Sequence, residues 1–137
     1  MQTPVGVIGV EFVLAEFGGK WPSFHDAEVL RFALERTELS DVVATLRVNL
    51  RRYESRGVGT VDYHQALVQS VLIDFLFTGV EDLAVSDFNH QNVIDGITFS
   101  HGGSGAPVSV ELSGIYGFDG SWRCSRAEIV GVSRGAE

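Results

Sequence analysis

The sequence predicts a mainly β fold, with six to seven mostly antiparallel strands in a curved or partly closed sheet and a short N-terminal helix. Apolar and polar residues alternate with a period of two through several segments, which is typical of strands with one buried face. Short links, several containing glycine, separate these segments and favour antiparallel hairpins. The 137 residues are 45% hydrophobic, which suffices for one core, so we expect residues 1–137 to form a single β-rich domain.

The helix is expected over residues 8–17. Ile8, Phe12 and Ala15 recur there at helical spacing, and the pair Gly18-Gly19 provides a stop.

Strands are expected wherever the alternation is clear. In the first of them Leu30, Phe32 and Leu34 lie on one face. Residues 37–41 then form a hairpin turn, residues 53–63 an exposed loop around two glycines, residues 101–107 a turn, and Asp119-Gly120 a hairpin turn. The expected strands cover residues 28–36, 42–51, 67–77, 83–85, 93–99, 108–118 and 122–132.

The net charge indicates which class of macromolecule the protein binds. The net charge is −8, with nine arginines and a single lysine, and such a surface repels phosphate backbones. We therefore expect no nucleic acid and favour a basic protein as partner. The longest apolar stretch, residues 72–77, is far too short to cross a membrane. A lone cysteine, Cys124, favours a reducing compartment, and we expect the cytoplasm.

The first segment that stands out chemically is Trp21-Pro22-Ser23-Phe24-His25-Asp26-Ala27-Glu28. In a structural interpretation, Pro22 fixes a turn, Trp21 and Phe24 pack into the core, and His25 or Asp26 binds loop backbone groups. At least one of these two polar side chains should then be buried and hydrogen-bonded. The alternatives are recognition of a partner, and metal binding or acid–base chemistry.

The second such segment is Asp87-Phe88-Asn89-His90-Gln91-Asn92. Amides are poor general bases, so this set points to recognition or to satisfaction of backbone groups. We predict no catalytic residue, no metal ligand and no cofactor. The candidate binding residues are Trp21, Phe24, His25, Asp26, Glu28, Asn89, His90, Gln91 and Asn92.

Two other functions remain open at this stage. A small metal-dependent hydrolase would require His25 and Asp26 to converge with His90 or His64 around an open coordination position. A small-ligand-binding β-barrel would require a roomy interior, whereas nine phenylalanines favour a filled one.

Three blocks of this sequence resemble the bacterial immunity protein 50 family. They are WPSFHDAE at residues 21–28 with the strand that follows, FNHQNVI at residues 88–94, and YGFDGSWRCSR at residues 116–126. The first block is the most distinctive, and Phe24, His25, Asp26 and Glu28 match it. The resemblance extends from about residue 16 to residue 132.

This resemblance implies a β-rich, non-catalytic protein that neutralises a cognate polymorphic toxin by tight binding. No catalytic residue is carried over from the family. The acidic charge balance adds the expectation that the toxin is basic, and an open sheet edge would allow a homodimer.

Overall fold

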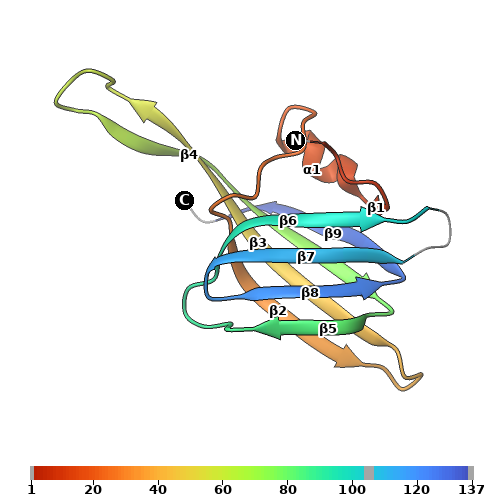
Figure 1. Cartoon of the computed structure of the whole chain (residues 1–137). Coiled ribbons are helices and arrows are strands. Elements are labelled where there is room, and N and C mark those ends of the chain that lie inside the picture. The colour runs from red at the N-terminus through yellow and green to blue at the C-terminus, as the bar shows by residue number, and fades with distance from the viewer. Residues whose placement is uncertain (1, 104–106, 136–137) are drawn as a thin grey trace.

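A computed structural model describes residues 2–103 and 107–135. These residues form nine strands and one short helix (Figure 1). The strand order in the sheet is β1-β9-β4-β3-β2-β6-β7-β8-β5. The elements are β1 (Val7–Ile8), α1 (Val10–Glu16), β2 (Glu28–Arg36), β3 (Val42–Arg56), β4 (His64–Thr78), β5 (Glu81–Ser86), β6 (Val93–His101), β7 (Val108–Tyr116), β8 (Asp119–Cys124) and β9 (Arg126–Arg134).

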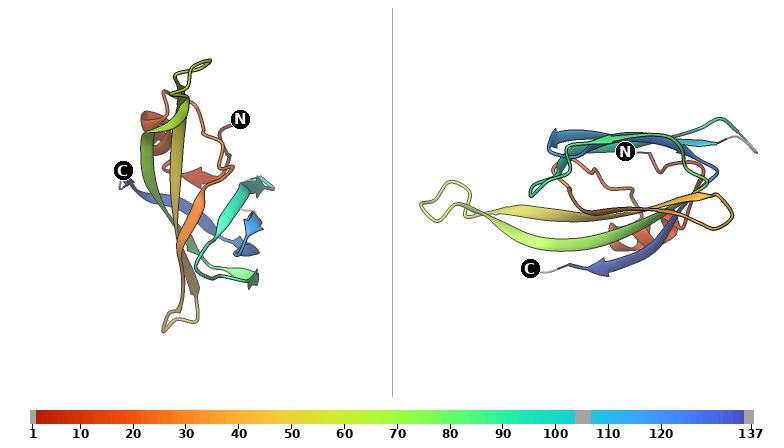
Figure 2. Two further views of the ribbon diagram at one scale, coloured as in Figure 1. Left: turned by 90° about the vertical axis from the view of Figure 1, so that its left-hand side faces the viewer. Right: turned by 90° about the horizontal axis from the view of Figure 1, so that it is seen from below.

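The sheet is folded into two layers that face each other (Figure 2). One layer holds β1, β9, β4, β3 and β2, and the other holds β6, β7, β8 and β5. The layers are linked where the start of β2 pairs with the start of β6, through the residue pair Glu28–Val93. All strand pairs are antiparallel except β1 with β9. The mainly β and mostly antiparallel prediction is confirmed.

Aromatic side chains fill the space between the layers. The ring of Phe32 lies 5.3 Å from that of Trp122 and 5.1 Å from that of Phe118, between centroids. Phe77 meets Trp122 edge-on at 5.1 Å. Such pairs stabilise by about 0.5–1.5 kcal/mol beyond the burial of their area. The sequence expectation that the phenylalanines fill the interior is met in this part of the chain.

The strand count of six to seven is wrong, because the described residues form nine strands. The two-residue β1 carries no alternation that could have predicted it. The segment expected as one strand over residues 122–132 is divided at Ser125, where the chain crosses from one layer to the other. Trp122 and Cys124 point inward at even positions, whereas Ala127 and Ile129 are buried at odd positions. This change of phase marks the crossing.

The expected hairpin turn at Asp119-Gly120 is also wrong by two residues. Both residues belong to β8, and the turn is made by Gly117 and Phe118. Gly117 has φ 76°, and a Cβ atom there would lie 2.2 Å from the carbonyl oxygen of Gln91. Only glycine fits this close approach of two loops.

The remaining expectations need smaller corrections. The helix is confirmed and runs over Val10–Glu16. Leu30 and Leu34 are not buried with Phe32, since they are 47% and 48% exposed. Leu30 lies at a register shift between Val29 and Arg31, whereas Leu34 shares the face of Phe32 but lies near the end of the strand. The middle of the expected turn at 101–107, residues 104–106, lies outside the described residues. Within residues 2–103 and 107–135, no helix has the length and apolar character of a membrane span.

Buried Asn92 connects two loops and the start of β2 where the layers meet. Its Oδ1 accepts hydrogen bonds from the backbone N–H groups of Asn89, at 2.9 Å, and Phe118, at 3.2 Å. Its Nδ2 donates to the carbonyl oxygen of Asn89 at 2.8 Å. The N–H of Val29 donates to the backbone carbonyl oxygen of Asn92. Because its side chain is 4% exposed, water cannot replace these partners.

Asn92→Ala should lower the free energy of unfolding by about 2 kcal/mol, because buried N–H groups lose their acceptor. The matched control is Gln91→Ala in the same loop, an exposed position where the change should stay within about 0.5 kcal/mol. Urea unfolding of the two variants checks this. Equal stability of both would contradict the role given to Asn92.

Candidate functional site

The corner at residues 21–28 is anchored by two aromatic side chains. Trp21 is 6% exposed and Phe24 is 2% exposed, and their rings lie 5.5 Å apart. Phe24 also lies 6.4 Å from Phe75 in β4. Both rings therefore belong to the core, as the structural interpretation expects.

The backbone of this corner is satisfied by β6 and by the corner itself. The N–H of Asp26 donates to the carbonyl oxygen of Ile94, and the N–H of Ile94 donates to the carbonyl oxygen of Ala27. The N–H of Ala27 donates to the carbonyl oxygen of Phe24. These backbone groups need no side-chain partner, which frees His25 and Asp26 to point into solvent.

The prediction that His25 or Asp26 is substantially buried is wrong. Their side chains are 57% and 72% exposed. His25 is nevertheless hydrogen-bonded: its Nδ1 lies 2.8 Å from Oδ1 of Asp95, and its Nε2 lies 3.5 Å from Oδ1 of Asp26. Asp95, in β6, was not a sequence candidate, and only the pairing of the corner with β6 brings it here.

The candidate residues at 89–92 fall into two groups. Asn89, His90 and Gln91 are exposed, whereas Asn92 is buried and holds the loop. Asn89 also shapes the loop, because its Nδ2 donates to the carbonyl oxygen of Asp87 and its Oδ1 accepts from the N–H of Gln91. Glu28 is half-buried at the start of β2. The candidates whose side chains a partner can reach are thus His25, Asp26, Asn89, His90 and Gln91.

The described residues offer little that fits a metal ion. His64 lies on a different element from His25, and its Nδ1 lies 2.8 Å from the carbonyl oxygen of Asp62. Within residues 2–103 and 107–135, no group of three or more His, Cys, Asp or Glu side chains is arranged to hold a metal ion. The structure therefore brings forward no support for the metal-dependent hydrolase.

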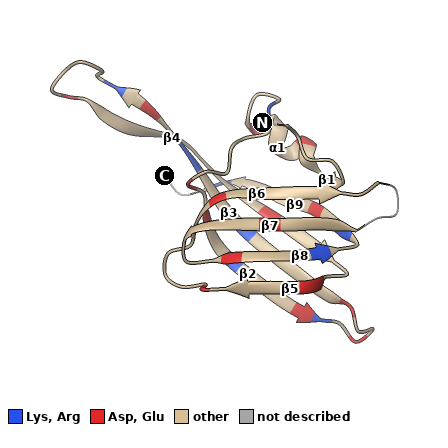
Figure 3. Cartoon of the chain, viewed as in Figure 1, with Lys and Arg blue, Asp and Glu red and all other residues tan. Residues whose placement is uncertain are grey.

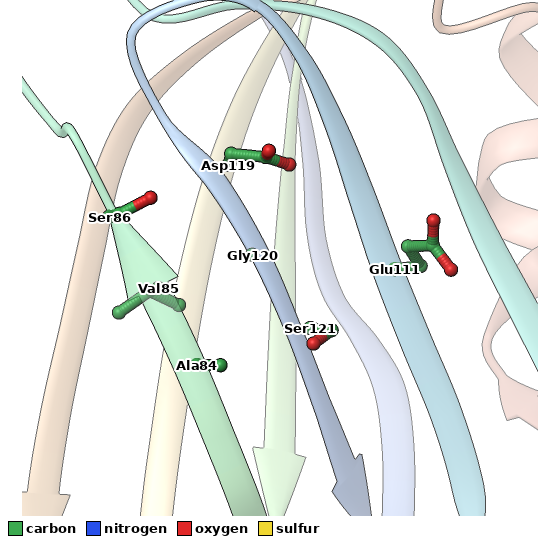
Figure 4. Close-up of a pocket in the computed structure, with 7 residues that line it drawn as sticks. All are labelled: Ala84, Val85, Ser86, Glu111, Asp119, Gly120 and Ser121. Carbon is green, nitrogen blue, oxygen red and sulfur yellow. The ribbon is translucent and has the colours of Figure 1, made fainter.

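Several hollows open onto the surface of the described residues. One of about 360 Å³ lies on the outside of β5, β7 and β8 (Figure 4). Its polar lining includes Glu111, Asp119, Ser86 and Ser121. The space between the two layers is filled by the aromatic rings, so a small-ligand barrel finds no support in these residues either.

The most unusual feature is an arm formed by the far ends of β3 and β4, here defined as residues 51–65. It projects away from the two layers as a twisted two-stranded ribbon (Figures 1 and 2). Beyond Asn49 no residue of β3 pairs with β2, and before Val71 no residue of β4 pairs with β9. All residues of the arm are exposed.

The sequence predicts an exposed loop over residues 53–63, and the structure corrects this. β3 continues to Arg56, and β4 begins at His64. Because both faces of the ribbon are wet, no apolar alternation marks it. The remaining signal is the turn Gly57–Gly59 between two short polar runs that contain Tyr53 and Tyr63.

Each face of the arm carries its own side-chain network. On one face, Nε2 of Gln65 donates to Oγ of Ser55 at 3.0 Å and to Oη of Tyr63 at 2.9 Å. These neighbours, Ser55 and then Gln65, lower the pKa of the Tyr63 phenol. On the other face, the Glu54 carboxylate accepts from Arg52 at 3.2 Å and from Arg56 at 3.4 Å.

The base of the arm is fixed to the body. Nδ2 of buried Asn49 donates to Oγ of Ser70 at 3.0 Å and to the carbonyl oxygen of Val71 at 3.3 Å. Nε2 of Gln69 donates to the carbonyl oxygen of Glu16 at the end of α1. The corner lies next to this base, since Glu28 pairs with Asn49. The corner and the arm therefore occupy the same end of the molecule.

Cys124 is unsuited to nucleophilic chemistry. It is 1% exposed, burial raises the pKa of its thiol to about 11, and its Sγ lies 3.7 Å from the carbonyl oxygen of Val108. At pH 8 on the order of one thiol in a thousand is ionised.

Iodoacetamide should therefore fail to alkylate the native protein at pH 8 within a time that alkylates the urea-unfolded chain completely, because the thiolate is both scarce and covered. Reaction should speed up as the pH approaches 11. Mass spectrometry of timed samples measures it. Equal rates in the native and unfolded states would contradict the buried placement of Cys124.

A comparison with known protein families covers nearly the whole chain. The family model described as Immunity protein 50 matches residues 11–135, which includes the corner, the loop at 87–92 and the arm. No curated protein and no solved structure matches the chain. The match covers nearly all of the sequence, and the chain belongs to the immunity protein 50 family.

Proposed function

We propose that this protein binds a cognate bacterial toxin in the cytoplasm and neutralises it without catalysis. The observation that carries the proposal is the family match over residues 11–135. Two features of the described structure support it: aromatic rings pack between the layers, and the exposed candidate residues of the corner and of the loop at residues 87–92 lie side by side, because Glu28 pairs with Val93.

The charge of the molecule favours a basic toxin. The chain carries a net charge of −8, and an acidic surface attracts a basic partner over long range. Such steering raises the association rate by ~10-fold or more at low salt. The exposed corner residues, His25 and Asp26, together with Asn89, His90 and Gln91, are proposed as part of the contact surface.

Co-expression tests the proposal directly. Bacteria that produce the toxin encoded beside this chain should stop growing, and the intact protein should restore growth. A core variant, Val48→Asp, is the control: Val48 is fully buried, so the folded protein and the rescue should both be lost. No rescue by the intact protein would count against toxin binding.

Stoichiometry separates binding from catalysis. When the purified protein is titrated into the purified toxin, toxin activity should fall linearly and end at a fixed molar ratio near one to one. An enzyme that inactivates the toxin would complete the inhibition at far lower ratios, given time. That outcome would contradict the non-catalytic proposal.

His25→Ala and Asp26→Asn should leave the stability of the protein within about 1 kcal/mol of wild type, because exposed ion pairs contribute little. Thermal unfolding measures this. Both variants should weaken toxin binding if the corner is part of the contact surface. Unchanged binding with unchanged stability would remove the corner from that surface.

A further inference from the structure

The arm has no structural role that its contacts explain. A two-stranded ribbon is at best marginally stable in water, and ordering each backbone residue costs about 1–2 kcal/mol. Residues 51–65 are all exposed, so they bury almost no apolar area in return. Removing them should not weaken the core, because none of residues 51–65 belongs to the buried cluster.

The composition of the arm is that of a binding hot spot. Tyrosine and arginine are enriched among the residues that dominate protein–protein binding energy. The arm holds Tyr53, Tyr63 and three arginines: Arg51, Arg52 and Arg56. Its tip adds Val58 and Val61, which are 73% and 101% exposed.

The arm is also electrically unlike the rest of the chain. Residues 51–65 contain three arginines and two acids, Glu54 and Asp62, which gives +1. Since the whole chain carries −8, the remainder carries −9. Figure 3 shows basic positions along this ribbon, at the end of the molecule away from the turn at residues 37–41.

Side-chain hydrogen bonds within the ribbon and at its base favour one arrangement of the arm in the free protein. Gln65 bonds to both Ser55 and Tyr63 on one face, and Glu54 bonds to both Arg52 and Arg56 on the other. The buried Asn49 and the contact of Gln69 with α1 set its direction. A preorganised element loses less conformational entropy on binding, which is a property of binding elements.

We propose that the arm is the main toxin-binding element and that it enters a cleft lined by carboxylates on an otherwise basic toxin. The arginines pair with the acids of the cleft, and Tyr53 and Tyr63 pack on its walls. The acidic remainder of the chain faces the basic surface around it. This inference rests on the toxin-binding proposal above and names the surface that performs it.

The test measures binding of purified variants to the catalytically inactivated toxin encoded beside this chain. Arg52→Glu/Arg56→Glu and Tyr53→Ala/Tyr63→Ala should each weaken binding by about 30-fold or more, the size expected for hot-spot residues. The matched controls are Arg31→Glu/Arg36→Glu, the same change in charge on β2, and Phe12→Ala, an exposed aromatic residue on α1. The controls should bind within a few-fold of wild type.

A shortened variant checks the same claim without new charges. Replacing residues 54–66 by Asn-Gly joins the paired residues Tyr53 and Leu67 through a two-residue turn. Its melting temperature should stay close to that of wild type while toxin binding is lost. If this variant does not fold, the surface substitutions above decide the matter, since each leaves the core untouched.

Crosslinking locates the contact. Because Cys124 is buried, a photo-crosslinker attached through maleimide should label only the new thiol of Val61→Cys at the tip of the arm. Leu39→Cys, 87% exposed in the turn at the opposite end, is the control. The first should crosslink to the toxin and the second should not.

The outcomes separate the two proposals. Toxin binding that is equal in the arm variants and wild type would overturn the arm's role and leave the proposed function standing. No toxin binding by wild type would overturn both. A dimer of this chain in sedimentation that separates in Arg52→Glu/Arg56→Glu, or binding of an RNA oligonucleotide lost in that variant, would show a different occupant and overturn the inference.

Discussion

Contacts between aromatic rings hold the two layers of this sheet together, and the placement of the polar segments follows from them. Backbone hydrogen bonds join the layers along one edge, where the corner and the start of β2 meet residues 92–94. The packing of Phe32 and Phe77 on Trp122 holds the two layers together across the space between them. The corner, the loop at residues 87–92 and the base of the arm lie together at one end of the layers.

At the corner, buried aromatic residues position polar side chains that remain on the surface. Trp21 and Phe24 are buried, and the backbone between them and β2 pairs with β6. The side chains of His25, Asp26 and Asp95 therefore meet on the surface. There, their contacts with one another change the free energy of unfolding little. The nearby Asn92, by contrast, is buried, and its amide satisfies backbone groups of two loops. The arm, beside the corner, extends this polar end of the molecule by a ribbon that has no packing of its own.

Much of the fold could be predicted from alternation, since a half-buried strand must alternate. The strand at residues 28–36 was predicted with its observed bounds, and the short helix was predicted within two residues at its start. A ribbon that is exposed on both faces carries no apolar alternation. For this reason the sequence predicts a loop where the structure has the arm. Alternation also says nothing of which strands pair, so the meeting of His25 with Asp95 could not be foreseen. The division at Ser125 is seen only in the structure, where the buried positions change from even to odd between Cys124 and Ala127. In the sequence, Val130 and Val132 continue the even series.

Hydrogen–deuterium exchange of this protein with and without the inactivated toxin tests the account most directly. The amides of residues 51–65 that face outward from the ribbon have no strand beside them, so they exchange quickly in the free protein. The account predicts that the toxin slows exchange in residues 51–65 and in the corner at residues 24–28, and leaves the turn at residues 37–41 unchanged. Protection confined to the outer faces of the sheet, with the arm and the corner exchanging as in the free protein, would contradict it.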